Sequence, residues 1–390
     1  HRERHDRRAL RELAGAVAYE STEYPFTLGV ASGDATSHSV VLWTRILPNA
    51  SASVSTVLPT ALLVDWQIAL DPEFSEVTFS GTARADSEYG HSVHVEVRDL
   101  EPTVQFWYRF VAGTHTSAVG TTTVLPYHTT PDAFVLGSVH RTGTLGDWPG
   151  GYRDIASSAA HALVSIDRPP IGVTTLDDQR SAWAKALADP EVQAARASCT
   201  WQHALVGGEG PLGPDQHQAW WEHMPSRPIP TEQRPLPPAV RYWEIGALIE
   251  LLVIDEQRAD RDVLTAVDRL PGGVDRRYVC LARPRAPSEA VTGALDDLLA
   301  RHRALRILDV RTDDAARASG NVSGDREITR NSDQLWLPPL DHGADSGWTL
   351  HTVTPSLWSA SVRRWSGGAG GVPVETIVLT TTVEQPEWRS

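Results

Sequence analysis

Apolar and polar residues alternate along the first third of the chain, as they do in half-buried β-strands. The alternating apolar positions are Leu62, Val64, Trp66, Ile68 and Leu70, then Val93, Val95 and Val97, and then Phe106, Tyr108 and Phe110. Side chains two residues apart on a strand share one face, so each set marks the buried face of a strand. We therefore predict that residues 21–126 are all-β, with about the length of one β-sandwich.

The step from Leu100 to Pro102 leads into the last of these strands. A Leu-x-Pro lead-in resembles the corner of immunoglobulin-like and fibronectin-III-like sandwiches, where a tyrosine hydroxyl ties the corner. Phe106 stands at the tyrosine position, keeps the packing and lacks the hydroxyl. We expect a sandwich of this kind at the N-terminus.

The pattern changes after Leu125 and Pro126, where the turn-rich segment PYHTTPD follows. Short apolar runs then alternate with helical stretches, which is typical of α/β or α+β domains. Strands are expected at 134–137, 162–166, 249–254 and 305–310, and helices at 176–188, 190–197 and 289–303. Residues 225–240 are expected to form a loop, and residues after 347 the closing strands of a sheet. The whole chain is predicted to be α+β, with a second domain at 127–390.

Composition excludes some functions. The 390 residues suffice for two domains with hydrophobic cores. A net charge of -14 argues against a nucleic-acid backbone as partner, and no apolar run approaches the length of a membrane span. The two cysteines, Cys199 and Cys280, are compatible with one bridge or with two buried thiols. Nothing in the sequence identifies a protein partner.

Residues 1–20 are expected to be a charged tail or short helix. Arg7 and Arg8, followed by ALRELAGAVA, resemble a twin-arginine export signal. Because Arg11 and Glu12 interrupt the apolar part, the segment is at most a remnant of such a signal.

Two blocks of sequence resemble the PhoD-type alkaline phosphatase family. The first, FTLGVASGDATSHSVVLWTRI at 26–46, follows the family's G-V-A-S-G-D-P and S-V-V-L-W-T-R, with Ala35 in place of proline. The second comprises GGYRDIA, TTLDDQRSAWAKALADPEVQAARA, HQAWWEHMPSR, RYWEIGALIELLVIDEQRADRD and SGWTLHTVTPSLWSA, in the family's order. The resemblance implies a metallophosphoesterase-like domain of two packed mixed sheets flanked by helices. It also implies a secreted or periplasmic phosphatase or phosphodiesterase that acts on phosphate esters with iron and calcium.

Most metal ligands that the resemblance implies are replaced. Val139 stands where the family has an iron-binding cysteine, and Pro170 where it has an iron-binding tyrosine. The family's W-D-D-H-E motif reads Trp201–Leu205 here, and its L-T-G-D-x-H motif has Thr312 for aspartate and Asp314 for histidine. The segment between 262 and 289 is also shorter than in the family, and we expect this loss to thin one sheet.

The residues near these positions that can still bind a metal are Asp167, His140, His203, Asp313 and Asp314. Asp167 is the carboxylate retained in register, but an ordinary strand-end carboxylate beside Arg168 is the better explanation, because a lone ligand builds no site. His203 is expected to hydrogen-bond to the core, and the two aspartates to lie in a solvated turn. His140 comes one residue after the cysteine position, so on an extended chain it points to the opposite side.

We favour the hypothesis of a PhoD-like pseudoenzyme that needs no cofactor. The alternative is an active phosphatase with a metal site rebuilt from those five residues and with iron and calcium as cofactors. A third hypothesis is a chain that preserves the fold without a selected function. Motifs of other hydrolases and of nucleotide-binding proteins, G-x-S-x-G, the phosphate loop and H-E-x-x-H, are missing from the sequence.

Overall fold

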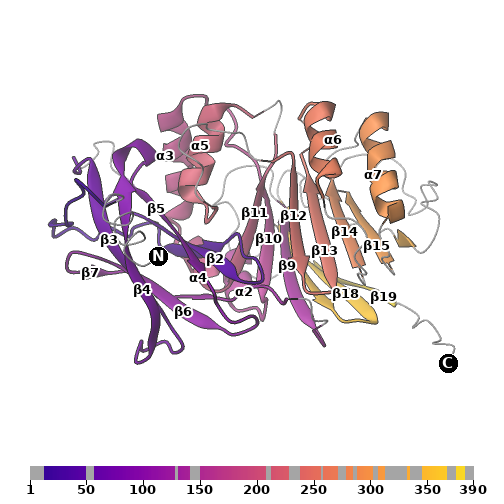
Figure 1. The fold of residues 1–390 in the computed structure, drawn as a ribbon, viewed down its shortest axis with the longest axis horizontal. Coiled ribbons are helices and arrows are strands. Elements are labelled where there is room, and N and C mark those ends of the chain that lie inside the picture. The colour runs from indigo at the N-terminus through magenta and orange to yellow at the C-terminus, as the bar shows by residue number, and fades with distance from the viewer. Residues whose placement is uncertain are drawn as a thin grey trace, which may run out of the picture.

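The computed structural model describes residues 13–49, 57–127, 131–140, 150–207, 212–227, 238–255, 258–270, 278–283, 288–301, 306–311, 332–333, 345–366 and 375–382. In these ranges the chain forms three β-sheets and two groups of helices, an α+β fold (Figure 1).

Sheet I has nine strands and runs through the molecule in the order β19-β18-β17-β9-β10-β11-β1-β2-β5. The strands are β1 (Val30–Gly33), β2 (Ser39–Arg45), β5 (Ser92–Arg98), β9 (Phe134–His140), β10 (Ala162–Asp167), β11 (Thr200–Leu205), β17 (Asp345–Val353), β18 (Leu357–Ser366) and β19 (Glu375–Thr382). Strands β9, β10 and β11 are parallel, so their carboxyl ends meet at one edge of the sheet. Strands β10 and β11 are buried along their whole length, as expected for parallel strands covered on both faces.

Sheets II and III cover different parts of one face of sheet I. Sheet II comprises β12 (Val240–Ile245), β13 (Ile249–Ile254), β14 (Tyr278–Arg283), β15 (Arg306–Arg311) and β16 (Ser332–Asp333). Sheet III comprises β3 (Ala61–Ala69), β4 (Val77–Asp86), β6 (Phe106–Ala112), β7 (His115–Thr116) and β8 (Gly120–Thr122), with the 3-10 turn η1 (Ser87–Tyr89) after β4. Leu62 of sheet III, Trp243 of sheet II and Val164 of sheet I belong to one continuous core.

Helices cover the outer faces. The opposite face of sheet I packs against α2 (Gly151–Ala156), α3 (Leu176–Leu187), α4 (Pro190–Ala197) and α5 (Pro214–His223) in a second core. The outer face of sheet II packs against α6 (Asp260–Asp268) and α7 (Glu289–Arg301). None of the helices in the described ranges is both long and apolar enough to cross a membrane.

Local sequence explains where the predicted helices begin. Thr175 caps α3 by accepting from the amide of Asp178, and Asp189 caps α4 through the amides of Glu191 and Val192. Pro190 at the first turn of α4 fits there because its missing N–H would have no helical partner. The predicted helices at 176–188 and 190–197, and their junction at Asp189, are confirmed.

The other predictions had mixed outcomes. Strands were found at 134–140, 162–167, 249–254 and 306–311, and the helix after 289 ends at Arg301. The expectation that a short segment between 262 and 289 thins one sheet was wrong. That segment still contains most of α6 and all of β14, which pairs with both β13 and β15.

Sheet I crosses the predicted domain boundary at residue 126. Strand β1 pairs in parallel with β11, with Ser32 opposite Thr200 and Gly33 opposite Trp201. A Cβ atom added to Gly33 would lie 2.2 Å from the carbonyl oxygen of Trp201 and 2.7 Å from the side chain of Pro225. Glycine is therefore required where the N-terminal strands join the parallel strands.

We predict that Gly33→Ala lowers the free energy of unfolding by about 2 kcal/mol or more, because backbone atoms that cannot yield occupy the space of the new methyl group. The control is Gly293→Ala in α7, where an added Cβ meets nothing within 4 Å and a stabilisation of about 0.5–1 kcal/mol is expected. Guanidinium denaturation of both variants checks this. Equal effects of the two substitutions would contradict it.

Candidate functional site

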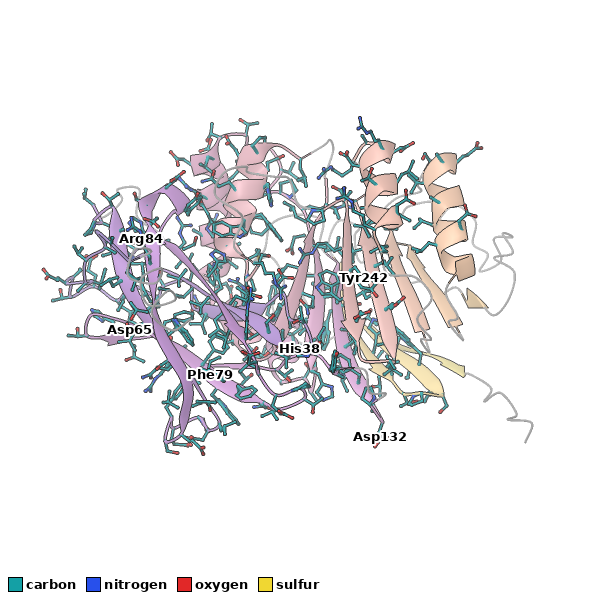
Figure 2. The ribbon with its side chains drawn as sticks, in the orientation of Figure 1. His38, Asp65, Phe79, Arg84, Asp132 and Tyr242 are labelled. Atoms are coloured by element: carbon teal, nitrogen blue, oxygen red, sulfur yellow. The ribbon has the colours of Figure 1, made fainter. Side chains whose placement is uncertain are left out.

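The candidate site lies at the carboxyl edge of β9, β10 and β11, beside α5. Asp132, labelled in Figure 2, precedes β9 and marks the opposite, amino end of these strands. Val139, Ser165 and His203 are neighbours in register across the three strands. Their side chains therefore share the face that the helices cover, and Asp167, two residues after Ser165, shares it too.

Asp167 is the centre of a buried hydrogen-bond network. One carboxylate oxygen, Oδ2, lies 2.7 Å from Nδ1 of His203 and accepts a hydrogen bond from Nε1 of Trp220 at 2.9 Å. The other oxygen, Oδ1, accepts the hydroxyl of Ser165 at 2.6 Å. The Asp167 and His203 side chains are 1% and 2% exposed. Such a network stabilises a carboxylate in the interior, where a charge without partners would be costly.

Val139 and Gln202, which stand where the resemblance implies metal ligands, pack or hydrogen-bond within the fold instead. Val139 is fully buried among apolar side chains and lies opposite Trp348 of β17 in register. Gln202 points to the other face of β11, where its side chain bonds both to the amide of Ala35 at 3.1 Å and to its carbonyl oxygen at 2.9 Å. Gln202 thus links strand β11 to the backbone segment that follows β1.

The described residues at these positions do not fit an iron and calcium pair. Such cations need several oxygen, nitrogen or thiolate ligands directed at one point. In the described ranges, no group of three or more His, Cys, Asp or Glu side chains has the spacing to hold a metal ion. Valine has no ligand atom, and the Asp167 oxygens already accept from Ser165, His203 and Trp220.

The five predicted ligands have different outcomes. The structure brings Asp167 and His203 into direct contact. His140 pairs with Ile166 in register, the alternate position from that of Val139, and its side chain lies outside the described residues. Asp313 and Asp314 also lie outside the described residues.

A second polar cluster joins the end of β1 to sheet II. Asp34 adopts a left-handed backbone conformation, with φ at 47°. Its carboxylate accepts from Arg241 of β12 at 2.7 Å and from the amide of Arg227 at 3.0 Å, and the Arg227 guanidinium also lies against it. Burial by itself raises the pKa of the Asp34 carboxyl, but Arg241, Arg227 and their hydrogen bonds outweigh burial and hold that pKa below its ordinary value.

Helix α5, which supplies Trp220, is anchored by a buried polar cluster. Glu222 is fully buried and accepts two hydrogen bonds from Arg180 of α3, each at 2.6 Å, and one from Gln218 at 2.8 Å. His223 contacts Arg45 of β2 through Nε2 and the carbonyl of Ala219 through Nδ1. Because Arg45 and Arg180 come from different elements, these bonds fix α5 over the sheet.

Sequence reasoning identified Asp167 and His203 separately but missed Trp220 and the anchoring cluster. Trp220 had no sequence signal beyond the family-like segment HQAWWEHMPSR. Cys199 is a buried free thiol, and burial raises its pKa to about 12. The Cys280 side chain lies outside the described residues.

The chain is similar to known phosphatases. Residues 12–126 match the model for the N-terminal domain of PhoD-like phosphatases. Alkaline phosphatase D of Bacillus subtilis (strain 168) is 29% identical over 280 residues, which is 61% of this chain and 47% of that protein. These matches support the resemblance of the chain to PhoD-type phosphatases. The chain spans about half the length of this curated PhoD-type relative.

Two solved structures share the fold. The structure of PhoD superposes with a TM-score of 0.72 and 19% identity, covering 94% of this chain and 92% of that one. A purple acid phosphatase, PPD1 from yellow lupin (Lupinus luteus) seeds, superposes with a TM-score of 0.56 and 10% identity, covering 92% and 74%. These likenesses show that the α+β architecture is that of PhoD.

We predict that Asp167→Ala lowers the free energy of unfolding by about 2–4 kcal/mol, because buried His203 and Trp220 lose their common acceptor. The control is Asp177→Ala, whose side chain is 91% exposed; its effect should stay within about 0.5 kcal/mol. Chemical denaturation at neutral pH measures both. A change for Asp167→Ala no larger than that of the control would show that the network contributes little to stability.

We also predict that stability falls between pH 6.5 and about 4, in part through His94 of β5. Its ring stacks on Trp221 at 4.0 Å, and Nε2 lies 3.0 Å from two carbonyl oxygens. Burial lowers the pKa of His94 from 6.5 to about 4. The unfolded chain therefore takes up a proton first as the pH falls, so this contribution is complete above pH 6.5 and about 3 kcal/mol of it is lost by pH 4.

The variant His94→Gln tests this contribution, because glutamine keeps a donor but does not titrate. The loss of stability between pH 7.5 and 4 should be smaller in His94→Gln than in the parent protein. His38→Gln, at an exposed position, should keep the parent's pH dependence. Identical pH dependence in all three proteins would exclude His94 as a contributor.

Proposed function

We propose that this PhoD-type protein is a pseudoenzyme whose phosphoesterase domain has lost its metal site and performs no phosphoester hydrolysis. The proposal is supported most strongly by the hydrogen bonds of the buried Asp167 carboxylate to other protein groups. Its carboxylate, the metal-bridging ligand by resemblance, accepts from three protein groups and is shielded from solvent. Metal-assisted hydrolysis needs cations that polarise the phosphoryl group and activate a water, and Val139 and Gln202 supply no anionic ligand to replace those lost.

The organisation of the chain forms part of the same proposal. Residues 21–126 would be an immunoglobulin- or fibronectin-III-like sandwich, and residues 127–390 the phosphoesterase-like domain. The protein would be secreted or periplasmic, like the family it resembles, and would not bind a nucleic-acid backbone. The two-sheet packing of β1, β2 and β5 against sheet III supports the sandwich.

The contact between Asp167 and His203 favours one alternative, an active metal-dependent phosphatase with a rebuilt site. A carboxylate that bonds one ring nitrogen of a histidine orients the ring for metal binding or proton transfer. In that case His140, Asp313 and Asp314 would complete the site, with iron and calcium as cofactors and a phosphate ester as substrate. The near-complete burial of Asp167 and His203 argues against this alternative.

Metal content and turnover, measured on one preparation, decide between the two. We predict substoichiometric iron and calcium by elemental analysis, and hydrolysis of p-nitrophenyl phosphate and bis-p-nitrophenyl phosphate no faster than in buffer after incubation with either metal. A metallophosphatase assayed in parallel is the positive control. Stoichiometric metal with turnover that His203→Gln abolishes would overturn the pseudoenzyme proposal in favour of the rebuilt site.

A further inference from the structure

The last turn of α5 ends in a histidine whose two ring nitrogens both have protein partners. His223 is fully buried. Its Nδ1 atom lies 2.6 Å from the carbonyl oxygen of Ala219, and its Nε2 atom contacts the Arg45 guanidinium of β2. A guanidinium can only donate, so Nε2 is the acceptor, and the carbonyl requires the ring hydrogen on Nδ1. These contacts therefore fit the neutral imidazole, with Nε2 unprotonated.

Charged groups from four elements lie around this ring. They are Arg45 of β2, Arg180 of α3, Arg196 of α4 and Glu222 of α5. Glu222 accepts two hydrogen bonds from Arg180, and Arg196 donates to the carbonyl oxygen of His223 at 2.6 Å. Burial, and then the charge of Arg45, are the main causes that hold the pKa of His223 well below its ordinary value. A proton on Nε2 would end the hydrogen bond from Arg45 and place a second positive charge against it.

The same turn also carries the tryptophan that contacts Asp167. Trp220 donates to the Asp167 carboxylate at 2.9 Å. The turn is attached to β5 by a second titratable ring, that of His94, which stacks on Trp221 with centroids 4.0 Å apart and places Nε2 3.0 Å from the carbonyl oxygens of Trp221 and Met224. Displacement of this turn from the sheet would therefore withdraw Trp220 from Asp167.

We propose that His223 makes the last turn of α5 an acid-sensitive clasp, which is closed over the sheet at neutral pH and is released when the ring takes up a proton. In the released form the ring is separated from Arg45, and its pKa returns to about 6.5, the value of an unperturbed histidine. Because the closed form binds the proton more weakly, each pH unit below about 6.5 favours release by up to about tenfold. Release would separate Trp220 from Asp167 and expose the carboxyl edge of the parallel strands.

Hydrogen exchange of the full chain, followed by mass spectrometry and corrected for the intrinsic rate at each pH, tests the clasp. All proteins carry His94→Gln, so that the titration of His94 does not contribute. Between pH 7 and 4.5 the amides of residues 218–224 should lose protection at least about tenfold and become less protected than those of β13. Added His223→Gln should reduce this loss to about threefold or less, because glutamine keeps a donor and an acceptor but takes up no proton. The control, His38→Gln at an exposed position, should leave the loss unchanged.

Circular dichroism at pH 7 establishes that each variant is folded. If His223→Gln is not folded, Arg45→Gln carries the test, because removal of the facing charge lets the closed form accept the proton and should likewise reduce the loss. Amides of α5 that keep their protection at pH 4.5, or that stay as protected as those of β13, would overturn the inference. A loss of protection that His223→Gln leaves unchanged would assign the acid sensitivity to another group and would also overturn it.

Discussion

The close approach of β1 to β11 is the constraint on which the rest of the arrangement depends. Gly33 allows the two strands to pair beside the carbonyl of Trp201, and the next residue, Asp34, is thereby placed against Arg227 and Arg241. One backbone contact therefore joins the N-terminal strands, the parallel strands and sheet II. The N-terminal part contributes three strands to the central sheet, so its packing and the shape of the carboxyl edge are coupled.

Helix α5 is likewise joined to other elements by buried contacts. Polar groups of Glu222 and His223 hold this helix through Arg180 and Arg45, which belong to α3 and β2. A helix fixed by buried ionic and hydrogen-bonded contacts has little freedom to move, because each partner left alone in the interior would cost several kcal/mol. The position of Trp220 beside Asp167 is thus set in part by the contacts of Glu222 and His223 on the same helix.

The sequence predicted those parts of the fold whose signals are local. Helices α3 and α4 have capping residues at Thr175 and Asp189, and β10 is a continuous apolar run, so each could be recognised from a few neighbouring residues. Helix α5 was missed because it buries polar residues, Glu222 and His223 among them, which removes the usual amphipathic pattern. The shared sheet was missed because it depends on contacts between positions about 170 residues apart.

In the candidate site too, the sequence predicted what depends on neighbouring residues and missed what depends on contacts between distant ones. Aligning Asp167 with the family's motif identified one retained carboxylate, but the reason for its retention appears only in three dimensions. Three hydrogen bonds from Ser165, His203 and Trp220 make the carboxylate part of the core, so replacing it would leave buried donors without an acceptor even where no metal is bound. Retention of a ligand residue is therefore weak support for retained catalysis when that residue has acquired structural partners. Val139 and Gln202, by contrast, stand where the resemblance implies metal ligands, and they fill these positions by packing and by backbone hydrogen bonds, with no ionic partner needed.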